Sequence, residues 1–186
     1  RKLEEGKIKI LVHSLAKGNL KPMVSDSIPI LQTDDFQLTI QAMGISLYDW
    51  VKSVFEAKLF SEDARVVSFT SEGNSKAWNS YAAVSAAKVT LEAITRSIAL
   101  EYARFGIRAN CIQAGVTNTA SLRMIPASDD IKKHSLLRSP FNRLTLPEDV
   151  ANVVYLLCKE QCINKAGKLM QDAIFEAGDF INEILL

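Results

Sequence analysis

The chain has 186 residues, 48% of them hydrophobic and 23% charged, which is a composition typical of one soluble globular domain. Lysine and arginine number 22 against 21 acidic residues, and this balance argues against nucleic-acid binding. The sequence has no apolar run as long as the roughly 20 residues of a membrane span. It begins RKLEEGK, which is typical of neither a signal peptide nor an organelle-targeting peptide. We therefore expect a cytoplasmic protein.

The three cysteines are too few and too irregularly spaced for a disulfide framework. Cys158 and Cys162 lie four residues apart, but neither histidine is near them in sequence. We expect reduced thiols and no metal site.

The first half of the chain alternates between strand and helix patterns. Residues 7–14 (KIKILVHS) are short and rich in β-branched residues, as in a buried parallel strand. A loop with Gly18 and two prolines follows, and a helical pattern begins at about Asp34. Residues 64–71 (ARVVSFTS) are predicted to form the next strand.

The second half continues the alternation. Ser80 is a candidate N-cap for a helix that runs to about Phe105, and Gly106 is suited to end it in the left-handed conformation. Residues 107–115 are predicted to form a third strand. A long loop region covers residues 116–146, and Pro147 then starts another helix. Residues 168–178 (KLMQDAIFEAG) are the candidate last strand.

This order predicts an α/β fold, a doubly wound parallel sheet with helices on both faces, in one domain over residues 1–186. Ligands of such sheets bind beyond the carboxyl ends of the strands. Residues 13–18, 71–80 and 114–119 follow those ends, so we expect them to converge in space.

Tyr81 and Lys88 lie seven residues apart on the predicted helix, which is close to two turns or about 10.5 Å. They share one stripe of the helix, with Val84 between them. A nearby ammonium favours a phenolate and would lower the pKa of the tyrosine. Such a phenol can protonate an oxygen on which charge develops. In the alternative interpretation, Tyr81 only caps the helix and Lys88 is solvated.

Four stretches of the chain resemble the short-chain dehydrogenase/reductase superfamily, and most closely its enoyl-[acyl-carrier-protein] reductases. They are ILVHSLAKG (residues 10–18), VVSFTSEG (66–73), SYAAVSAAKVTLEAITRSIALEYARFGIRANCIQAGVTNT (80–119) and SPFNRLTLPEDVANVVYLLC (139–158). Ordinary members carry Tyr-x3-Lys, but this chain has Val84 at that tyrosine position. Enoyl reductases carry Tyr-x6-Lys, which matches Tyr81 and Lys88. HSLA and Met43, the latter at the place of an asparagine in ordinary members, also favour the enoyl reductases.

The resemblance implies a Rossmann-like fold and NADH- or NADPH-dependent reduction of a trans-2-enoyl thioester bound to acyl-carrier protein or coenzyme A. It implies that Tyr81 stabilises or protonates the enolate, that Lys88 binds the cofactor ribose, and that Ser71 contacts substrate. The other cofactor contacts that it implies are Ser14, Leu15, Ala16, Ala114, Gly115, Val116 and Thr119. It further implies a homotetramer, or a dimer.

Residues 116–146 correspond in the resemblance to a mobile substrate-binding loop, or lid. Within it, Leu122, Met124 and Ile125 are the candidate contacts for an acyl chain. A solvated surface helix would have the same mixed polarity.

The glycine-rich turn of the family has no counterpart, because the eight glycines contain no G-x-G-x-x-G. Residues 7–14 align with the family's fourth strand, so we expect an incomplete domain that belongs to a longer protein. Two other functions stay open: a 3-oxoacyl or other carbonyl short-chain reductase, and a catalytically silent subunit or scaffold.

Overall fold

A computed structural model describes residues 6–159 and the backbone of residues 174–176. Its strands form one parallel sheet in the order β1-β2-β3-β4. They are β1 (Ile8–His13), β2 (Phe60–Ser71), β3 (Ile107–Ala114) and β4 (Ile174–Glu176). The predicted α/β fold with a parallel sheet is confirmed. The remainder of the predicted strand over residues 168–178 lies outside the described residues.

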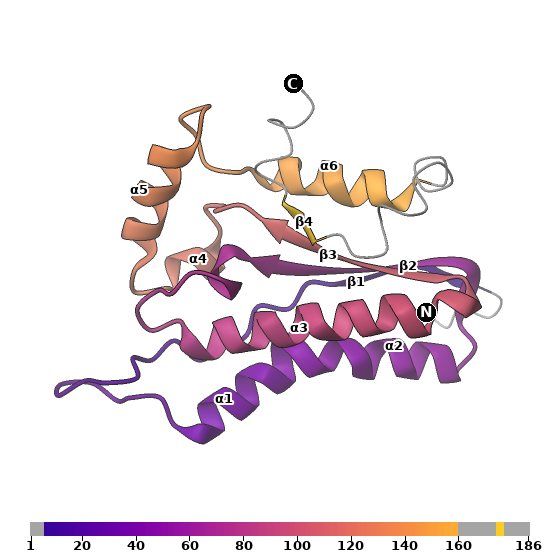
Figure 1. Cartoon of the computed structure of the whole chain (residues 1–186), viewed down its shortest axis with the longest axis horizontal. Coiled ribbons are helices and arrows are strands. Elements are labelled where there is room, and N and C mark those ends of the chain that lie inside the picture. The colour runs from indigo at the N-terminus through magenta and orange to yellow at the C-terminus, as the bar shows by residue number, and fades with distance from the viewer. Residues whose placement is uncertain (1–5, 160–173, 177–186) are drawn as a thin grey trace.

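Helices cover both faces of the sheet (Figure 1). α1, α2 and α3 lie on one face and α6 on the other, while α4 and α5 lie beyond the carboxyl ends of β2 and β3. The helices are α1 (Thr33–Ile40), α2 (Ser46–Glu56), α3 (Ala82–Glu101), α4 (Ala120–Arg123), α5 (Ser128–Arg138) and α6 (Pro147–Cys158). Short turns of other helix types are η1 (Gln41–Ile45), η2 (Glu72–Asn74) and η3 (Ala103–Phe105).

Each face of the sheet packs on its own apolar cluster, because neighbouring strand residues point to opposite faces. Val66 packs against α2 and α3 with Leu47 and Leu91, and all three side chains are fully buried. Val67, the next residue, packs on the other face with Leu157 of α6. This two-sided burial explains why the strands have nearly continuous apolar sequences.

Two predicted helix boundaries differ in outcome. The predicted left-handed conformation of Gly106 is confirmed, with φ of 76°, and a Cβ there would collide with the carbonyl oxygen of Glu62. The α-helix itself ends earlier than predicted, at Glu101, and Gly106 caps the short turn η3 that follows it. The predicted N-cap at Ser80 is wrong. Ser80 has φ of 61° within a turn that is closed by a hydrogen bond from the Tyr81 N–H to the Trp78 carbonyl (3.3 Å), so the N-cap is Tyr81.

The helical pattern that begins at about Asp34 is divided in the structure. α1 and α2 are joined by η1, a π-helical turn that contains Met43 and Gly44, both buried. Gly44 lies against α3, where a Cβ would be 3.1 Å from the Ala87 carbonyl oxygen. The lack of a side chain therefore lets the two helices pack closely. No helix in the described part of the chain is long and apolar enough to cross a membrane.

Candidate active site

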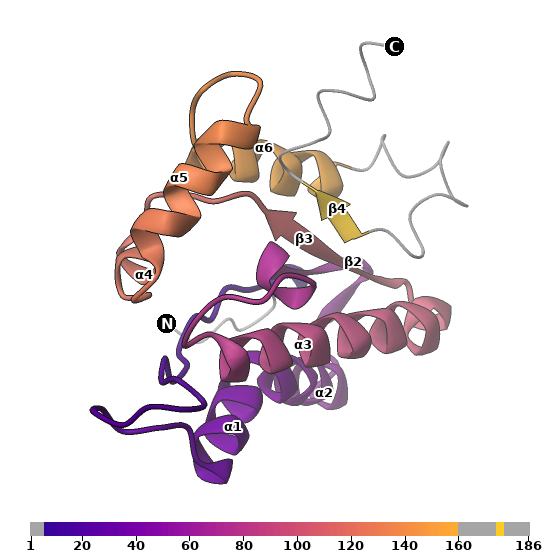
Figure 2. The same cartoon turned by 60° about the vertical axis from the view of Figure 1, so that its left-hand side comes forward.

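The carboxyl ends of the strands form one wall of a cleft of about 470 Å³. Residues Ser71 of β2 and Ala114 of β3 are paired in the sheet, which brings the two predicted segments together. α4 and α5 lie opposite the N-terminal end of α3 (Figure 2). Leu122 of α4, Ile131 of α5 and Tyr81 at the start of α3 line the cleft. Its predicted lining residues are Ser14, Ala16, Ser71, Tyr81, Ala114, Gly115, Val116, Thr119, Leu122 and Ile125.

Tyr81 faces the cleft from the start of α3, with its ring packed beside Val84 and Met43. Its hydroxyl oxygen lies 3.4 Å from the Ser71 hydroxyl oxygen. Gly73 covers the other side of the ring so closely that a Cβ there would overlap Tyr81 Cε1. The phenol is therefore fixed between the end of β2 and the apolar face of α3.

Lys88 lies deeper, with only 8% of its surface exposed, and it does not line the cleft. Its Nζ donates a hydrogen bond to the Phe69 carbonyl oxygen at 2.7 Å. Burial lowers the pKa of Lys88 to about 8, although the Cys111 thiol and the Glu92 carboxylate act in the opposite direction.

The expectation that Lys88 lowers the pKa of Tyr81 is wrong for this structure. Burial raises the pKa of Tyr81 above 10, and the opposing contribution comes from the hydrogen bond with Ser71. The phenol is therefore protonated at neutral pH, as a tyrosine in water also is. A protonated phenol is the form that can donate a hydrogen bond or a proton to an oxyanion.

The buried lysine makes a testable contribution to stability. Lys88 releases its proton near pH 8 in the folded protein but near 10.5 when unfolded, so between these values the unfolded state binds more protons. The free energy of unfolding of the wild type, minus that of Lys88→Met, should therefore increase by about 1 kcal/mol between pH 7 and pH 9. Urea unfolding of both proteins at the two pH values measures this difference. A difference that stays constant or falls would contradict the buried position of the ammonium.

The segment after β1 reaches the cleft through Ser14 and Ala16. Leu15, between them, points away and is 44% exposed, as expected where consecutive side chains of an extended segment alternate. Its predicted backbone contact with a cofactor stays a prediction. Gly18 then passes over α3, where a Cβ would lie 2.9 Å from Val84 Cγ2.

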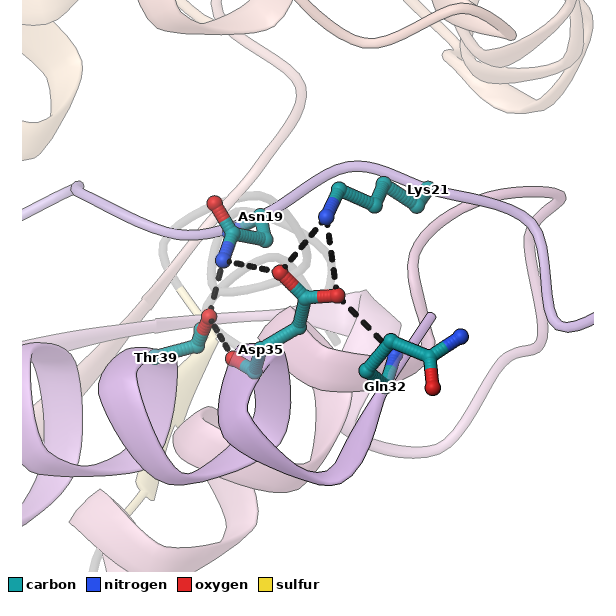
Figure 3. Close-up of polar contacts among 5 residues, drawn as sticks. All are labelled: Asn19, Lys21, Gln32, Asp35 and Thr39. Atoms are coloured by element: carbon teal, nitrogen blue, oxygen red, sulfur yellow. Dashed lines mark hydrogen bonds and ion pairs between the residues drawn. The ribbon is translucent and has the colours of Figure 1, made fainter. Parts of the chain in front are cut away.

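A polar cluster on α1 holds this segment in place (Figure 3). The Asp35 carboxylate accepts hydrogen bonds from Asn19 Nδ2 (2.7 Å), Lys21 Nζ (2.8 and 2.9 Å) and the Gln32 backbone N–H (2.9 Å). The Asn19 backbone N–H donates to the Thr39 hydroxyl at 3.0 Å. The hydrogen bond from Lys21 is the main cause that lowers the pKa of Asp35. Asp35 thus ties both ends of the long loop before α1 to one helix.

The segment after β3 contributes both backbone and side chains to the cleft. Gly115 passes so close to Thr145 that a Cβ would overlap the Thr145 hydroxyl, and Thr117 forms a bridge with the same residue. The Thr119 hydroxyl accepts a hydrogen bond from the Leu122 N–H (3.2 Å) and begins α4. This sharp departure from the sheet opens the space beyond Ser71.

The predicted lid contains α4 and α5. Leu122 and Ile125 line the cleft, but Met124 does not, and its side chain is 73% exposed. Met124 is turned away from the cleft because a residue two positions after Leu122 lies on the opposite side of a helical turn, so its contact with an acyl chain stays a prediction.

Two contacts join α5 to the segment after β2. Arg138 forms an ion pair with Glu72 (3.1 Å), and the ring of His134 packs edge-on against that of Trp78 with centroids 5.7 Å apart. Sequence patterns did not predict these contacts, nor the presence of Trp78, Thr117 and Phe69 in the cleft wall. For Trp78 and Thr117, the sequence indicated only that they lie in segments expected to converge at the cleft.

Within residues 6–159, no group of three His, Cys, Asp or Glu side chains is arranged to hold a metal ion. The cleft and the wall behind it bring together hydroxyls, backbone groups, the Glu72 carboxylate and the buried Lys88 ammonium. A parallel sheet with a cleft at its carboxyl edge, and a Tyr and Lys on the helix after β2, defines a Rossmann-type fold of the short-chain dehydrogenase/reductase class.

The profile of the family described as "Enoyl-(Acyl carrier protein) reductase" matches residues 2–168. The chain belongs to this family. It is 30% identical over 156 residues to enoyl-[acyl-carrier-protein] reductase [NADH] 2 of Rhizobium meliloti (strain 1021), covering 82% of this chain and 56% of that protein. It is 28% identical over 172 residues to a 7alpha-hydroxysteroid dehydrogenase of Paraclostridium sordellii, covering 90% and 62%.

Among solved structures, FabI from Candidatus Liberibacter asiaticus superposes with a TM-score of 0.78 at 25% identity, covering 94% of this chain and 66% of that one. The predicted Rossmann-like fold is thus confirmed. The chain spans about three-fifths of the length of the two curated relatives named above.

Proposed function

We propose that the chain is part of an enoyl-[acyl-carrier-protein] reductase that uses NADH or NADPH to reduce trans-2-enoyl thioesters in fatty acid biosynthesis. The substrate would be carried by acyl-carrier protein or coenzyme A. Family membership and the NADH-dependent relative support this reaction class. The choice of an enoyl substrate over a carbonyl substrate depends on the site itself.

One observation carries that choice: the tyrosine that faces the cleft is Tyr81, three residues before Val84. Val84, the position of the tyrosine in ordinary short-chain reductases, is 6% exposed and packs with Met43 and Ala87. Gly18 covers it from the other side. A phenol at position 81 starts about 4.5 Å nearer the N-terminal end of α3 than one at position 84 would, because each helical residue rises about 1.5 Å.

The described residues fit the nicotinamide end of a dinucleotide. Lys88 does not line the cleft, but among the described residues its Nζ has one hydrogen-bond acceptor, the carbonyl of Phe69 in the cleft wall, so two of its three N–H donors would be left for the hydroxyls of a ribose that reaches it. Ser14 and Thr119 bring further hydroxyls to the cleft wall, and Gly115 and Val116 bring backbone groups. When bound, the dinucleotide would supply the hydride.

The remaining steps belong to side chains of this chain. Reduction at the β-carbon moves negative charge onto the thioester oxygen. Tyr81, whose pKa burial raises further above neutral, would donate a hydrogen bond to that oxygen and stabilise the enolate. Ser71 would hold the phenol in orientation through its hydroxyl. Leu122 and Ile125 would exclude water from the acyl chain.

A second candidate is a carbonyl short-chain reductase, and the similarity to the hydroxysteroid dehydrogenase favours it. In that reaction the proton of Tyr81 would go to the alkoxide rather than to an enolate. The two reactions therefore use the same donor and differ in the electrophilic carbon.

A substrate panel separates the two candidates. We expect the full-length protein to oxidise NADH or NADPH with a trans-2-enoyl thioester at a kcat/KM at least about 100-fold above that with the matching 3-oxoacyl thioester, a difference of about 3 kcal/mol. Absorbance at 340 nm follows both reactions. A preference for the 3-oxoacyl substrate would assign the carbonyl reductase function. No turnover and no dinucleotide binding would leave only a silent subunit.

The proposal extends to assembly and location. Trp50 of α2 and Leu100 of α3 are more than half exposed, and such apolar side chains suit contacts between subunits. We infer a homotetramer, or a dimer, in the cytoplasm.

A further inference from the structure

A buried carboxylate lies behind the cleft and, apart from its electrostatic effect on the Lys88 ammonium, has no part in the reaction described above. Glu92 of α3 is 7% exposed. Its Oε1 accepts hydrogen bonds from the Thr70 hydroxyl at 2.5 Å and from Asn74 Nδ2 at 2.6 Å. Asn74 Nδ2 also lies 3.3 Å from the Gln113 side-chain oxygen. One carboxylate oxygen thus connects the end of β2, the turn η2 and, through Asn74, the end of β3.

The groups that Glu92 holds are the neighbours of the proposed proton donor. Thr70 immediately precedes Ser71, whose hydroxyl contacts the phenol, and Asn74 ends the turn that contains Gly73. Gly73 lies directly on the ring of Tyr81. Its carbonyl also accepts a hydrogen bond from the Ser85 hydroxyl of α3. The turn η2 is therefore fastened to α3 at two places, and the ring of Tyr81 packs beneath it.

The carboxylate is well suited to hold this turn and poorly suited to act on substrate. It does not line the cleft, and no ion pair joins it to any residue of the described part of the chain. Lys88, one turn away on α3, directs its Nζ to the Phe69 carbonyl instead. Without Glu92, the Thr70 hydroxyl and the Asn74 side-chain amide would lose a buried hydrogen-bond acceptor. We expect the turn η2 to shift as a result.

We propose that Glu92 is a positioning residue for Tyr81, acting through Asn74 and the turn η2. The inference rests on the proposed function, since the placement of the phenol matters most if the phenol donates to an oxyanion. A displacement of about 1 Å at such a donor is enough to lower a rate by up to about 100-fold.

Three variants of α3 test the role of the acceptor. Glu92→Ala removes it, Glu92→Gln keeps an acceptor oxygen, and Glu101→Ala is the matched control at an exposed site of the same helix. We expect Glu92→Ala to lower kcat at least about tenfold while the Kd for NADH stays within about twofold. Glu92→Gln should recover kcat to within about threefold of wild type. A merely structural role would lower the active fraction and leave kcat per folded molecule unchanged, and that result would overturn the proposal.

Asn74→Ala is a second test of the positioning role. If Glu92→Ala does not fold, the kcat of Asn74→Ala tests the proposal by itself. Because both residues act through one link, the double variant should lose hardly more kcat than either single variant. Additive losses would overturn the link.

Amide hydrogen exchange separates failure of this inference from failure of the proposed function. The Ser75 and Lys76 N–H groups donate to the Glu72 carbonyl within the turn (3.2 and 2.9 Å). They should exchange at least about tenfold faster in Glu92→Ala than in Glu92→Gln, whatever the substrate is. Equal exchange rates in both variants would contradict the positioning role of Glu92, even if the enoyl reductase activity is found.

Discussion

Replacement of Tyr81 by phenylalanine should lower kcat for enoyl thioester reduction by about 100-fold or more, which is the usual loss when a general acid or an oxyanion donor is removed. The ring would still fill the space beneath Gly73 and beside Val84, so the fold should be retained. Because the hydroxyl is not needed to bind the dinucleotide, the Kd for NADH should stay within about twofold. Steady-state kinetics and fluorescence titration with NADH measure both quantities.

Tyr102→Phe is the matched control for this change. Tyr102 ends the same helix and packs edge-on against Phe55 at 5.1 Å, far from the cleft. Its kcat should equal that of wild type. If Tyr81→Phe keeps more than about a tenth of the activity and Ser71→Ala does not, the donor is the serine and the assignment of Tyr81 is wrong.

Replacement of Lys88 by methionine should raise the Kd for NADH or NADPH by about tenfold to 100-fold, as expected for the loss of hydrogen bonds from a charged donor. Methionine fills most of the volume of the lysine stem, so the packing between α3 and the sheet should survive. The kcat/KM for the dinucleotide should fall in parallel with the affinity. Isothermal titration with the cofactor gives the affinity directly.

Lys52→Met serves as the control, because Lys52 is an exposed lysine of α2 that pairs with Glu56 and lies outside the cleft. An unchanged Kd together with a strongly reduced kcat in Lys88→Met would contradict ribose binding. That pattern would instead show that the ammonium acts on the phenol.

Much of the fold followed from local patterns. Residues 66 and 67 are both valine because the strand is buried on both faces, and such apolar runs between helices indicate a parallel sheet. Gly106 and Pro147 marked an end and a start of helices because each residue type favours one backbone conformation. The spacing of Tyr81 and Lys88 placed both on one stripe of α3.

Other features depend on contacts between distant parts of the chain and left no local pattern. The helix begins at Ala82 because the turn after Trp78 needs a left-handed residue at position 80. Met124 points to solvent because the short helix α4 turns Leu122 inwards. The hydrogen bonds of Glu92 join residues 18 and 22 positions apart in the sequence.

The amino-acid sequence by itself determined the order of strands and helices, the family resemblance and the identity of the two residues most suited to the chemistry. Only the tertiary structure decided the pKa values of those two residues. Burial under Gly73 raises the pKa of Tyr81, and burial between α3 and the end of β2 lowers that of Lys88 to about 8. The desolvation of a charge depends on everything that packs around it, and the packing partners of these two residues come from the ends of β2 and from the loop after β1.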